Sequence, residues 1–432
     1  MKILINPSAE ALTEALKRPK LEEMQLEETV RVVFQEVEQS GDQALRMFTE
    51  RFDGVKLNAL KVSESEIIQA EALVSESLKK AIRIAAENIE RFHTSQRESV
   101  QIIETTPGVT CWRKSVPVQS VGLYIPGGTA PLFSTVLMLG IPAKIAVCPV
   151  RILCTPPAKD GSVHPAILFA ASVAGITEIY KVGGSQAIAA MSLGTESILK
   201  VDKLFGPGNQ YVTAAKQYAQ QLGIAIDLPA GPSEVLVAAD DSVPAAFIAA
   251  DLLAQAEHGA DSQVILLADS EVFVALIQQE LTKQLAQLPR AEIAEQALEN
   301  SVAIVADSSK WAGIINQYAP EHLILMGKYE QQVVEHVVNA GSVFLGQFTA
   351  ESFGDYASGT NHTLPTAGYA RAYSGVSLDS FVKKITYQRV SETGLQNLGN
   401  TVIELAKAEQ LDAHAYAVEV RLTTQNSQIQ EP

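Results

Sequence analysis

The sequence of 432 residues has few cysteines, few aromatic residues and no long apolar run. Its 3 cysteines are odd in number and lack CxxC spacing, which favours reduced, buried thiols over a disulfide framework. No apolar run approaches the roughly 20 residues that a membrane-spanning helix needs, so we expect no membrane span. The N-terminal segment MKILINPSAEALTEAL lacks the features of a signal or transit peptide, and we expect a cytoplasmic protein.

Positive charge is also scarce, because 33 Lys and Arg stand against 49 Asp and Glu, for a formal net charge of −16. Such a surface repels phosphate backbones, so nucleic acid is not an expected partner. The GxGxxG fingerprint of dinucleotide-binding proteins is absent as well, and loop spacing alone does not predict a nicotinamide cofactor. What is present is a chain with 47% hydrophobic residues that is long enough for more than one domain.

The pattern of apolar residues predicts an α/β fold. Residues up to about 100 read as helical, because their apolar positions recur every three or four residues. From residue 117, short apolar runs end in Gly/Pro loops and are followed by helix-like stretches, an order typical of a doubly wound parallel sheet. A second set of such units follows residue 240. From about residue 377 the strand pattern is lost, and a polar, helix-rich tail without a core of its own is predicted.

Gly-containing loops at strand ends could hold a dinucleotide. They lie at residues 124–128, 183–186, 206–209 and 231–233. Tyr124, Gln186 and Asn209 supply an aromatic ring and two amides there, and the helices that follow would direct their N-termini toward a bound phosphate. Each loop by itself is more typical of an ordinary turn between a strand and a helix. Taken together, the loops fit a nucleotide site and ordinary turns equally well.

Gln255 and His258 are candidate metal ligands, because a spacing of three places them on one face of a predicted helix. Asp355, in a turn-rich segment, and His414, in a predicted helix, would complete a set of two imidazoles, a carboxylate and an amide oxygen. This set suits Zn²⁺ and, without a thiolate, is typical of a catalytic rather than a structural zinc site. Each residue alone also fits a structural role, such as a histidine at the end of a helix.

The adjacent residues Glu321 and His322, in the segment YAPEHLIL, form a candidate acid/base pair. The imidazole of His322 titrates near neutrality and suits a general base, and Glu321 could activate water. Both side chains reach one site only if the backbone turns there, and Pro320, which restricts Ala319, predicts such a turn. A capping glutamate and a surface histidine are the alternative interpretation. The histidines that receive no role are His93, His164, His336 and His362.

The segments that carry these residues closely resemble histidinol dehydrogenases over nearly the whole chain. In order they are YIPGGTAPL, VGGSQAIAA, FGPGNQYV, IDLPAGPSEVLV, DLLAQAEHGADSQ, YAPEHL, GDYASGTNHTLPT and LDAHAYAVEVR. The resemblance implies an NAD-dependent homodimer with one zinc ion per subunit. Its reaction would be the oxidation of L-histidinol to L-histidine through histidinaldehyde, the last steps of histidine biosynthesis. It also implies two incomplete Rossmann-like domains.

The resemblance gives the candidate residues their roles. His322 would be the base that removes the alcohol proton, and Glu321 would activate the water that hydrates the aldehyde. These two residues and Ser233 and Glu409 would contact the substrate, as would the zinc ligands. The zinc ligands would be Gln255, His258, Asp355 and His414. The residues around NAD would be Tyr124, Gln186 and Asn209.

We therefore expect four parts in the chain. They are an N-terminal helical arm at residues 1–19, a first α/β domain formed by 20–121 and 235–376, a second α/β domain with the NAD-binding loops at 122–234, and a helical tail at 377–432. In the family that the chain resembles, the tail crosses to the other subunit. Glu409 and His414 would then complete the active site of the partner.

The residues also fit two other interpretations. Relatives that share the zinc and base residues oxidise other small polyols or sulfonated diols to acids. Glu409, which would pair with a positively charged amino group, favours histidinol over an anionic diol. A non-catalytic zinc-binding dimer would use the same metal ligands, but it would leave Glu321, His322 and the Gly/Pro loops without a role.

Overall fold

The computed structural model describes residues 1–18, 23–127, 131–229 and 231–428. The chain divides into two compact units, the first formed by Met1–Gln96 and Val118–Phe381 and the second by Arg97–Pro117 and Val382–Pro432. The first unit contains two parallel sheets, and the second contains an antiparallel sheet and two helices. Within the described ranges, no helix combines the length and the apolar character needed to cross a membrane.

The larger sheet of the first unit has the strand order β1-β11-β10-β9-β12-β13, and all its strands are parallel. The chain winds outward from β9 to β10 and β11 and then returns to β12 and β13, so the winding reverses between β9 and β12. Burial on both faces explains the apolar sequences of the central strands, such as EVLVAA and QVILLA. The strands are β1 (Lys2–Ile5), β9 (Glu234–Ala239), β10 (Gln263–Ala268), β11 (Val302–Val305), β12 (His322–Met326) and β13 (Ser342–Leu345).

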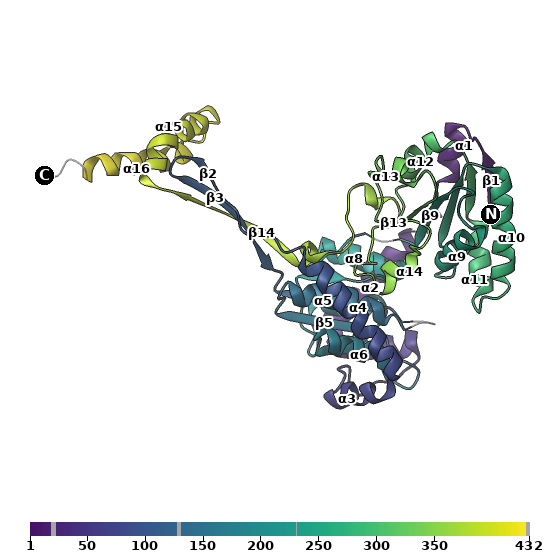
Figure 1. Ribbon diagram of the computed structural model, residues 1–432. Helices are drawn as coiled ribbons and strands as arrows, with labels where there is room; N and C mark the ends of the chain where they lie inside the picture. Colours follow the sequence, from purple (N-terminus) through teal and green to yellow (C-terminus); the bar gives the residue numbers. More distant parts are fainter. Residues whose placement is uncertain (19–22, 128–130, 230, 429–432) are drawn as a thin grey trace. The chain divides into compact units, whose positions relative to one another are not determined.

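Helices cover both faces of this six-stranded sheet (Figure 1). Val235 and Val237 of β9 share a core with residues of α9, α10 and α11, whereas Leu236 and Ala238 share one with Trp311 and its neighbours in α12. This alternation is the doubly wound arrangement that the sequence predicts. The helices are α1 (Ala9–Ala15), α9 (Ala245–Ala256), α10 (Glu271–Leu285), α11 (Ala291–Glu299), α12 (Trp311–Tyr318), α13 (Glu330–Val334) and α14 (Glu351–Tyr356), with the short 3₁₀ helices η2 (Ser308–Lys310) and η3 (Tyr369–Arg371). The 3₁₀ helix η4 (Leu378–Phe381) instead contacts α5 (Phe133–Ile145).

The second parallel sheet has the order β6-β5-β4-β7-β8, and its winding reverses between β4 and β7. Its strands are β4 (Ser120–Tyr124), β5 (Val150–Thr155), β6 (Glu178–Lys181), β7 (Lys203–Phe205) and β8 (Ala225–Ile226). The helices that follow its strands are α5 (Phe133–Ile145), α6 (Pro165–Ala174), α7 (Gly184–Leu193) and α8 (Gln210–Gln221). In open parallel sheets, ligands bind beyond the carboxyl ends of the strands where the winding reverses.

The helices that precede β4 in the chain belong with this second sheet. Helix α2 contacts α7 and α8, α3 contacts α6, and α4 contacts α5 and α6. The domain division predicted from the sequence instead places this segment in one domain with residues 235–376. An amphipathic pattern shows that a helix buries one face, but it does not show which sheet that face packs against. These helices are α2 (Glu23–Phe48), which is interrupted at Gly41 where φ is 48°, the π-helical turn η1 (Thr49–Asp53), α3 (Glu64–Leu73) and α4 (Glu76–Thr94).

Both ends of the chain contain a strand where the sequence predicts only helices. Residues Lys2–Ile5 form β1 and pair in parallel with β11, so the N-terminal arm begins as an edge strand. Residues Val382–Val390 form β14, which pairs with β3 (Val109–Pro117). The sequence of β14, VKKITYQRV, is largely polar and exposed, so it lacks the apolar alternation that signals a strand. The predicted boundary between residues 19 and 20 lies outside the described residues.

The second unit is built on the sheet β14-β3-β2, which is antiparallel. Its helices pack against each other through a small core formed by Ile403, Ala406 and Ala415. Its elements are β2 (Ile102–Thr106), β3 (Val109–Pro117), β14 (Val382–Val390), α15 (Glu392–Ala408) and α16 (Asp412–Gln428).

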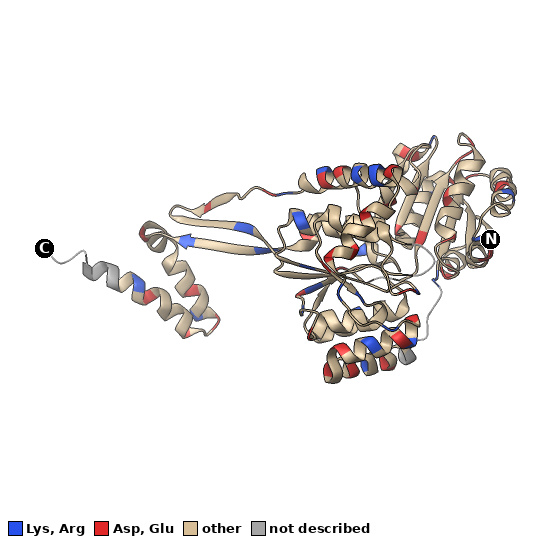
Figure 2. Cartoon of the chain, turned by 90° about the horizontal axis from the view of Figure 1, so that it is seen from below, with Lys and Arg blue, Asp and Glu red and all other residues tan. Residues whose placement is uncertain are grey.

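Charged residues of both signs are interspersed along the helices (Figure 2). This mixing is typical of helix faces exposed to water. The excess of acidic residues in the sequence is thus spread over many elements.

Candidate active site

The candidate acid/base pair lies where β12 begins, beside the start of β9. His322 is the first residue of β12 and is paired in register with Val235 of β9. Glu321 precedes it directly, and Glu234 opens the neighbouring strand. The site therefore lies at the amino ends of these strands, opposite to the carboxyl ends where α/β sheets usually bind ligands.

A break in the backbone brings Glu321 and His322 together. Helix α12 ends at Tyr318, and Ala319 adopts a left-handed conformation with φ of 54° before Pro320. The chain turns at the position that Pro320 predicts. As a result, His322 Nδ1 and Glu321 Oε2 are 3.7 Å apart although the residues are adjacent in sequence.

Burial and neighbouring carboxylates set the charge of this pair. Burial raises the pKa of Glu321 to about 7, although the nearby His322 acts to lower it. Burial lowers the pKa of His322, but the carboxylates of Glu351, Glu321 and Asp355 outweigh it and raise this pKa to about 10. A divalent cation bound beside Asp355 would reverse this balance, because it would neutralise carboxylates and repel an imidazolium.

Three side chains near this pair could hold a metal ion. His258, Glu351 and Asp355 each offer a ligand atom, and these atoms lie within 4.8 Å of one another. Asp355 and Glu351 belong to α14, whereas His258 follows the end of α9, where its N–H donates to the carbonyl of Gln255. Asp355 Oδ1 lies 3.3 Å from His322 Nε2, so the metal-ligand group and the acid/base pair form one cluster.

The side chain of Gln255 is buried and its amide has no partner. The residue is 1% exposed, and neither Oε1 nor Nε2 of its amide has a hydrogen bond. A buried amide without partners costs free energy unless a ligand satisfies it. Together with the imidazole of His258 and the carboxylate of Asp355, it supplies the nitrogen and oxygen donors that suit Zn²⁺, so these residues fit the predicted metal.

The remaining predicted substrate and metal residues lie in two places. Ser233 precedes Glu234 at the start of β9 and is partly exposed, next to the cluster. Glu409, at the C-terminus of α15, and His414, in α16, are exposed residues of the second unit.

Sequence reasoning missed two buried acids of this cluster. Glu351 Oε1 lies 3.9 Å from His322 Nδ1, and burial raises the pKa of Glu351. Burial also raises the pKa of Asp251, in α9, to about 7. A spacing of four could have revealed both, because Glu351 precedes Asp355 and Asp251 precedes Gln255 by one helical turn.

Two of the loops predicted to hold a dinucleotide, at residues 124–128 and 206–209, follow β4 and β7, where the winding of the second sheet reverses. The loop at 183–186 follows β6 of the same sheet, whereas the loop at 231–233 leads into β9 of the six-stranded sheet. The N–H of Gly184, at the start of α7, donates to the Tyr124 hydroxyl at 3.0 Å. Gln186 is buried and its Oε1 has no partner, so this oxygen is available to a ligand. Asn209 caps α8 by accepting from the N–H groups of Tyr211 and Val212. Gly128, in the first predicted loop, lies outside the described residues.

A histidine without a predicted role connects the two sheets. His362 Nδ1 lies 2.9 Å from the carbonyl oxygen of Asp355, and His362 Nε2 lies 3.1 Å from Thr135 Oγ1. Since a carbonyl only accepts, Nδ1 carries the proton and Nε2 accepts from the Thr135 hydroxyl. The segment that carries Asp355 is thereby tied to α5, a helix of the second sheet.

These features define a doubly wound α/β protein with a metal-ligand and acid/base cluster on one parallel sheet and a glycine-rich switch point on the other. Residues 16–422 match the family model of histidinol dehydrogenase. The chain belongs to the histidinol dehydrogenase family.

Close relatives cover almost the whole chain. A histidinol dehydrogenase from Bacteroides thetaiotaomicron is 57% identical over 425 residues, which span 98% of this chain and 99% of the relative. One from Xanthomonas campestris pv. campestris strain 8004 is 52% identical, over 96% of this chain and 97% of the relative. The crystal structure of histidinol dehydrogenase from Elizabethkingia anophelis matches with a TM-score of 0.96 and 55% identity, over 99% of both chains.

At the switch point of the second sheet, the close approach of the backbone to Tyr124 requires glycine at position 206. Gly206 has φ of 126°, and a Cβ there would lie 2.1 Å from the Tyr124 carbonyl oxygen, whereas Gly223 has φ of 85° and open space around it. Gly223→Ala should cost about 1 kcal/mol of stability, and Gly206→Ala at least about 3 kcal/mol, because it adds a backbone clash to the strain. Thermal unfolding of both variants measures the difference. Equal losses would contradict the close approach of β4 and β7.

The metal-ligand group predicts which variants lose zinc. His258→Asn and Asp355→Asn should each weaken zinc affinity at least about 100-fold, because they remove ligands, whereas Glu351→Gln should weaken it by about tenfold or less, as expected of a neighbouring group. Zinc content after dialysis against buffered zinc, measured by mass spectrometry, gives these affinities. If Glu351→Gln lost as much zinc as Asp355→Asn, Glu351 would be a ligand and the predicted set would be wrong.

Proposed function

We propose that this protein is a zinc- and NAD-dependent enzyme that oxidises L-histidinol to L-histidine through histidinaldehyde, in the last steps of histidine biosynthesis. The observation that carries the proposal is the contact between the acid/base pair and the metal-ligand group, with His322 Nε2 at 3.3 Å from Asp355 Oδ1, in a chain of this family. The overall reaction consumes one histidinol, two NAD⁺ and one water. It yields histidine, two NADH and three protons.

Gln255, His258, Asp355 and His414 are the proposed zinc ligands. Bound zinc would act as a Lewis acid that holds the amino and imidazole nitrogens of the substrate. The unpaired amide of Gln255 and the close grouping of His258 and Asp355 support this assignment.

His322 is the proposed base of both oxidations. Its Nε2 faces Asp355, and its Nδ1 is surrounded by oxygen atoms of Glu234, Glu321 and Glu351. A proton therefore sits favourably on Nδ1. With a divalent cation held by Asp355, the imidazole would lose its second proton, which would leave Nε2 to take the proton of the alcohol. A general base in this position typically contributes about 10² to 10⁴ in rate.

Glu321 is the proposed activator of water in the second oxidation. Its Oε2 accepts from the N–H of Glu234 at 2.9 Å, which fixes the carboxylate. A carboxylate whose pKa is about 7 can take a proton from water near neutral pH, because its conjugate acid is weak enough to be a useful acceptor. The aldehyde would thereby be hydrated before it is oxidised to the acid.

NAD is proposed to bind at the switch point of the second sheet, against Tyr124, Gln186 and Asn209, and would accept one hydride in each oxidation. The unpaired oxygen of Gln186 supports this placement. Burial raises the pKa of Tyr124 to about 12, so its hydroxyl stays protonated and can donate to a ligand while it accepts from Gly184.

Ser233 and Glu409 are proposed to contact the substrate, and the Glu409 carboxylate would accept a hydrogen bond from the amino group of the substrate. We place Glu409 and His414 in the active site of the partner subunit of a homodimer. The exposed apolar residues of the second unit support an intermolecular contact, because sheets that end in exposed apolar strands tend to be covered. They include Ile102, Ile103, Ile385 and Val390. The three free cysteines support a reducing compartment, and we propose a cytoplasmic location.

The ratio of NADH formed to histidinol consumed tests the proposed function. Purified protein with zinc and NAD should form two NADH per L-histidinol, and a chelator should abolish turnover until zinc is added back. No turnover of histidinol by zinc-loaded protein, with turnover of a small diol instead, would assign the chain a different substrate within the same chemistry.

Substitutions of the two members of the acid/base pair should impair different steps of the reaction. His322→Asn should slow both oxidations by about 10² to 10⁴, because each needs a proton acceptor at Nε2. Glu321→Gln should slow mainly the second, so histidinaldehyde accumulates and the NADH ratio falls toward one. Supplying histidinaldehyde directly separates the steps. A Glu321→Gln protein impaired only in alcohol oxidation would refute the assignment of water activation.

A shared active site should be restored by mixing two inactive variants. His258→Asn and His414→Asn alter different sides of the proposed interface, so heterodimers should contain one intact site. Partial activity should return after dissociation and reassociation, as measured by NADH formation. Heterodimers confirmed by tag-based purification but lacking activity would place both residues on one subunit.

A further inference from the structure

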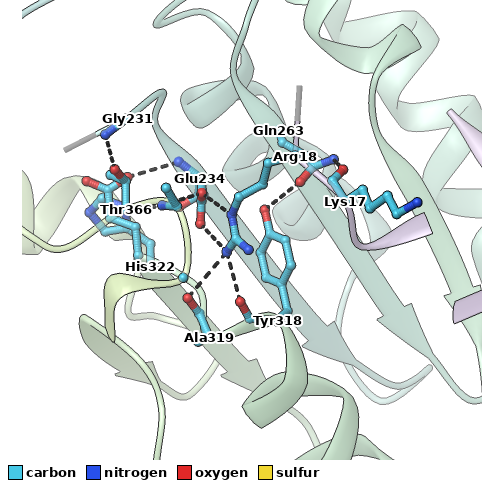
Figure 3. A network of polar contacts seen from close by, with 12 residues as sticks. Lys17, Arg18, Gly231, Glu234, Gln263, Tyr318, Ala319, His322 and Thr366 are labelled. Carbon is cyan, nitrogen blue, oxygen red and sulfur yellow. Dashed lines mark hydrogen bonds and ion pairs between the residues drawn. The ribbon is translucent and has the colours of Figure 1, made fainter. Parts of the chain in front are cut away.

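Glu234 holds both members of the acid/base pair through its backbone. Its N–H donates to Glu321 Oε2 at 2.9 Å, and its carbonyl oxygen lies 3.3 Å from His322 Nδ1 (Figure 3). A carbonyl can only accept, so this contact favours the tautomer with the proton on Nδ1 and the lone pair on Nε2. The orientation of Glu321 and the tautomer of His322 therefore depend on where the backbone of Glu234 lies.

The side chain of Glu234 is fixed by Arg18. The carboxylate is 2% exposed, and the guanidinium contacts it at two points, Nε to Oε1 and Nη2 to Oε2 at 2.8 Å. The N–H of Ala367 donates to Oε1 at 2.7 Å. A buried carboxylate with these three donors cannot change rotamer without leaving a charge unpaired, which is strongly unfavourable.

The same guanidinium holds the chain that leads into the pair. Arg18 Nη2 donates to the Tyr318 carbonyl at 2.8 Å, and its Cζ lies 4.2 Å from the centre of the Tyr318 ring. The Tyr318 hydroxyl in turn donates to Gln263 Oε1 at 2.9 Å. Tyr318 stands directly before the left-handed Ala319, so Arg18 contacts both the strand and the turn that position Glu321 and His322.

We propose that Arg18 is a positioning residue for the acid/base pair, acting through the carboxylate of Glu234 and the carbonyl of Tyr318. This inference rests on the proposed function. The hydrogen bonds of the Arg18 guanidinium go to Glu234, Tyr318 and Ala319 rather than to either member of the pair. Its effect on the reaction is therefore indirect, and it should change how well the pair is oriented rather than how substrate or NAD binds.

The test compares the Arg18→Met variant with the wild-type protein, both full-length and loaded with zinc. Methionine keeps the apolar stem of the side chain and removes the charge. Expressed per zinc-loaded site, kcat should fall about 10- to 100-fold, as for groups that orient catalytic side chains. KM for histidinol and for NAD should stay within about twofold, because uniform binding is retained. Lys17→Met is the matched control, since the neighbouring side chain is exposed and forms an ion pair with Glu14 on the surface, and its kcat should be unchanged.

A double variant separates positioning from a merely structural role. In the His322→Asn background, Arg18→Met should cause little further loss of kcat, because the imidazole on which both oxidations depend is already gone. A full multiplicative loss in that background, a wild-type kcat in Arg18→Met, or a loss that only follows the unfolded fraction would each overturn the proposal.

A second variant and a wild-type control complete the test. If Arg18→Met does not fold, Arg18→Lys is the variant to test, because lysine keeps the charge but not the two-point contact. The kcat of Arg18→Lys should fall about three- to tenfold at unchanged KM. A wild-type kcat would overturn the proposal. Wild-type protein that is zinc-loaded and does not oxidise histidinol would refute the proposed function instead, so the two failures are distinguishable.

Discussion

Four carboxylates lie close together at the amino ends of β9 and β12, and the arrangement of the site depends on how their charge is compensated. Glu234, Glu321 and Glu351 are each no more than 6% exposed, and Asp355 lies within 3.3 Å of the imidazole of His322. Ionised carboxylates in such surroundings are costly unless they are paired or bind a metal. Arg18 compensates Glu234 from within the chain. The other three share one imidazole, which is where a divalent cation is proposed to bind.

The acid/base pair and the proposed NAD site lie at opposite ends of the strands in their respective sheets. The carboxyl ends of the second sheet are free to bind a dinucleotide at the switch point between β4 and β7. The cluster on the first sheet can then hold the substrate. The hydrogen bonds of His362 to Asp355 and Thr135 join the two parts, so the segment with a proposed metal ligand is anchored to a helix of the proposed NAD-binding sheet.

Much of the fold could be predicted because its signals are local. Apolar runs that end in Gly/Pro loops predict parallel strands, and Pro320 predicts the turn that brings Glu321 toward His322. The partners of the amphipathic helices could not be predicted in this way. Helices α2 to α4 pack against the second sheet although the sequence groups them with the first, because periodicity carries no information about the partner. The polar strand β14 escapes prediction because its side chains are exposed on both faces.

The candidate site shows the same limit. Gln255, His258, Glu321 and Asp355 are recognisable from residue type and motif, whereas Arg18 and Glu234 are not. They lie 216 residues apart and meet only in the folded chain. Arg18 and Glu234 position the acid/base pair through backbone groups, and a sequence does not show which carbonyl faces an imidazole. Glu351 and Asp251 are intermediate cases, since a spacing of four residues links each to a predicted ligand.

We propose that a metal ion bound by Asp355 compensates the carboxylates that are not paired with Arg18. Diffraction at the zinc absorption edge, from crystals of the full-length protein grown with zinc, tests it most directly. We expect one anomalous peak per chain, bound by Gln255, His258 and Asp355 together with His414, and Glu234 still paired with Arg18. A peak bound by Glu351 in place of Gln255, or no peak between His258 and Asp355, would contradict it.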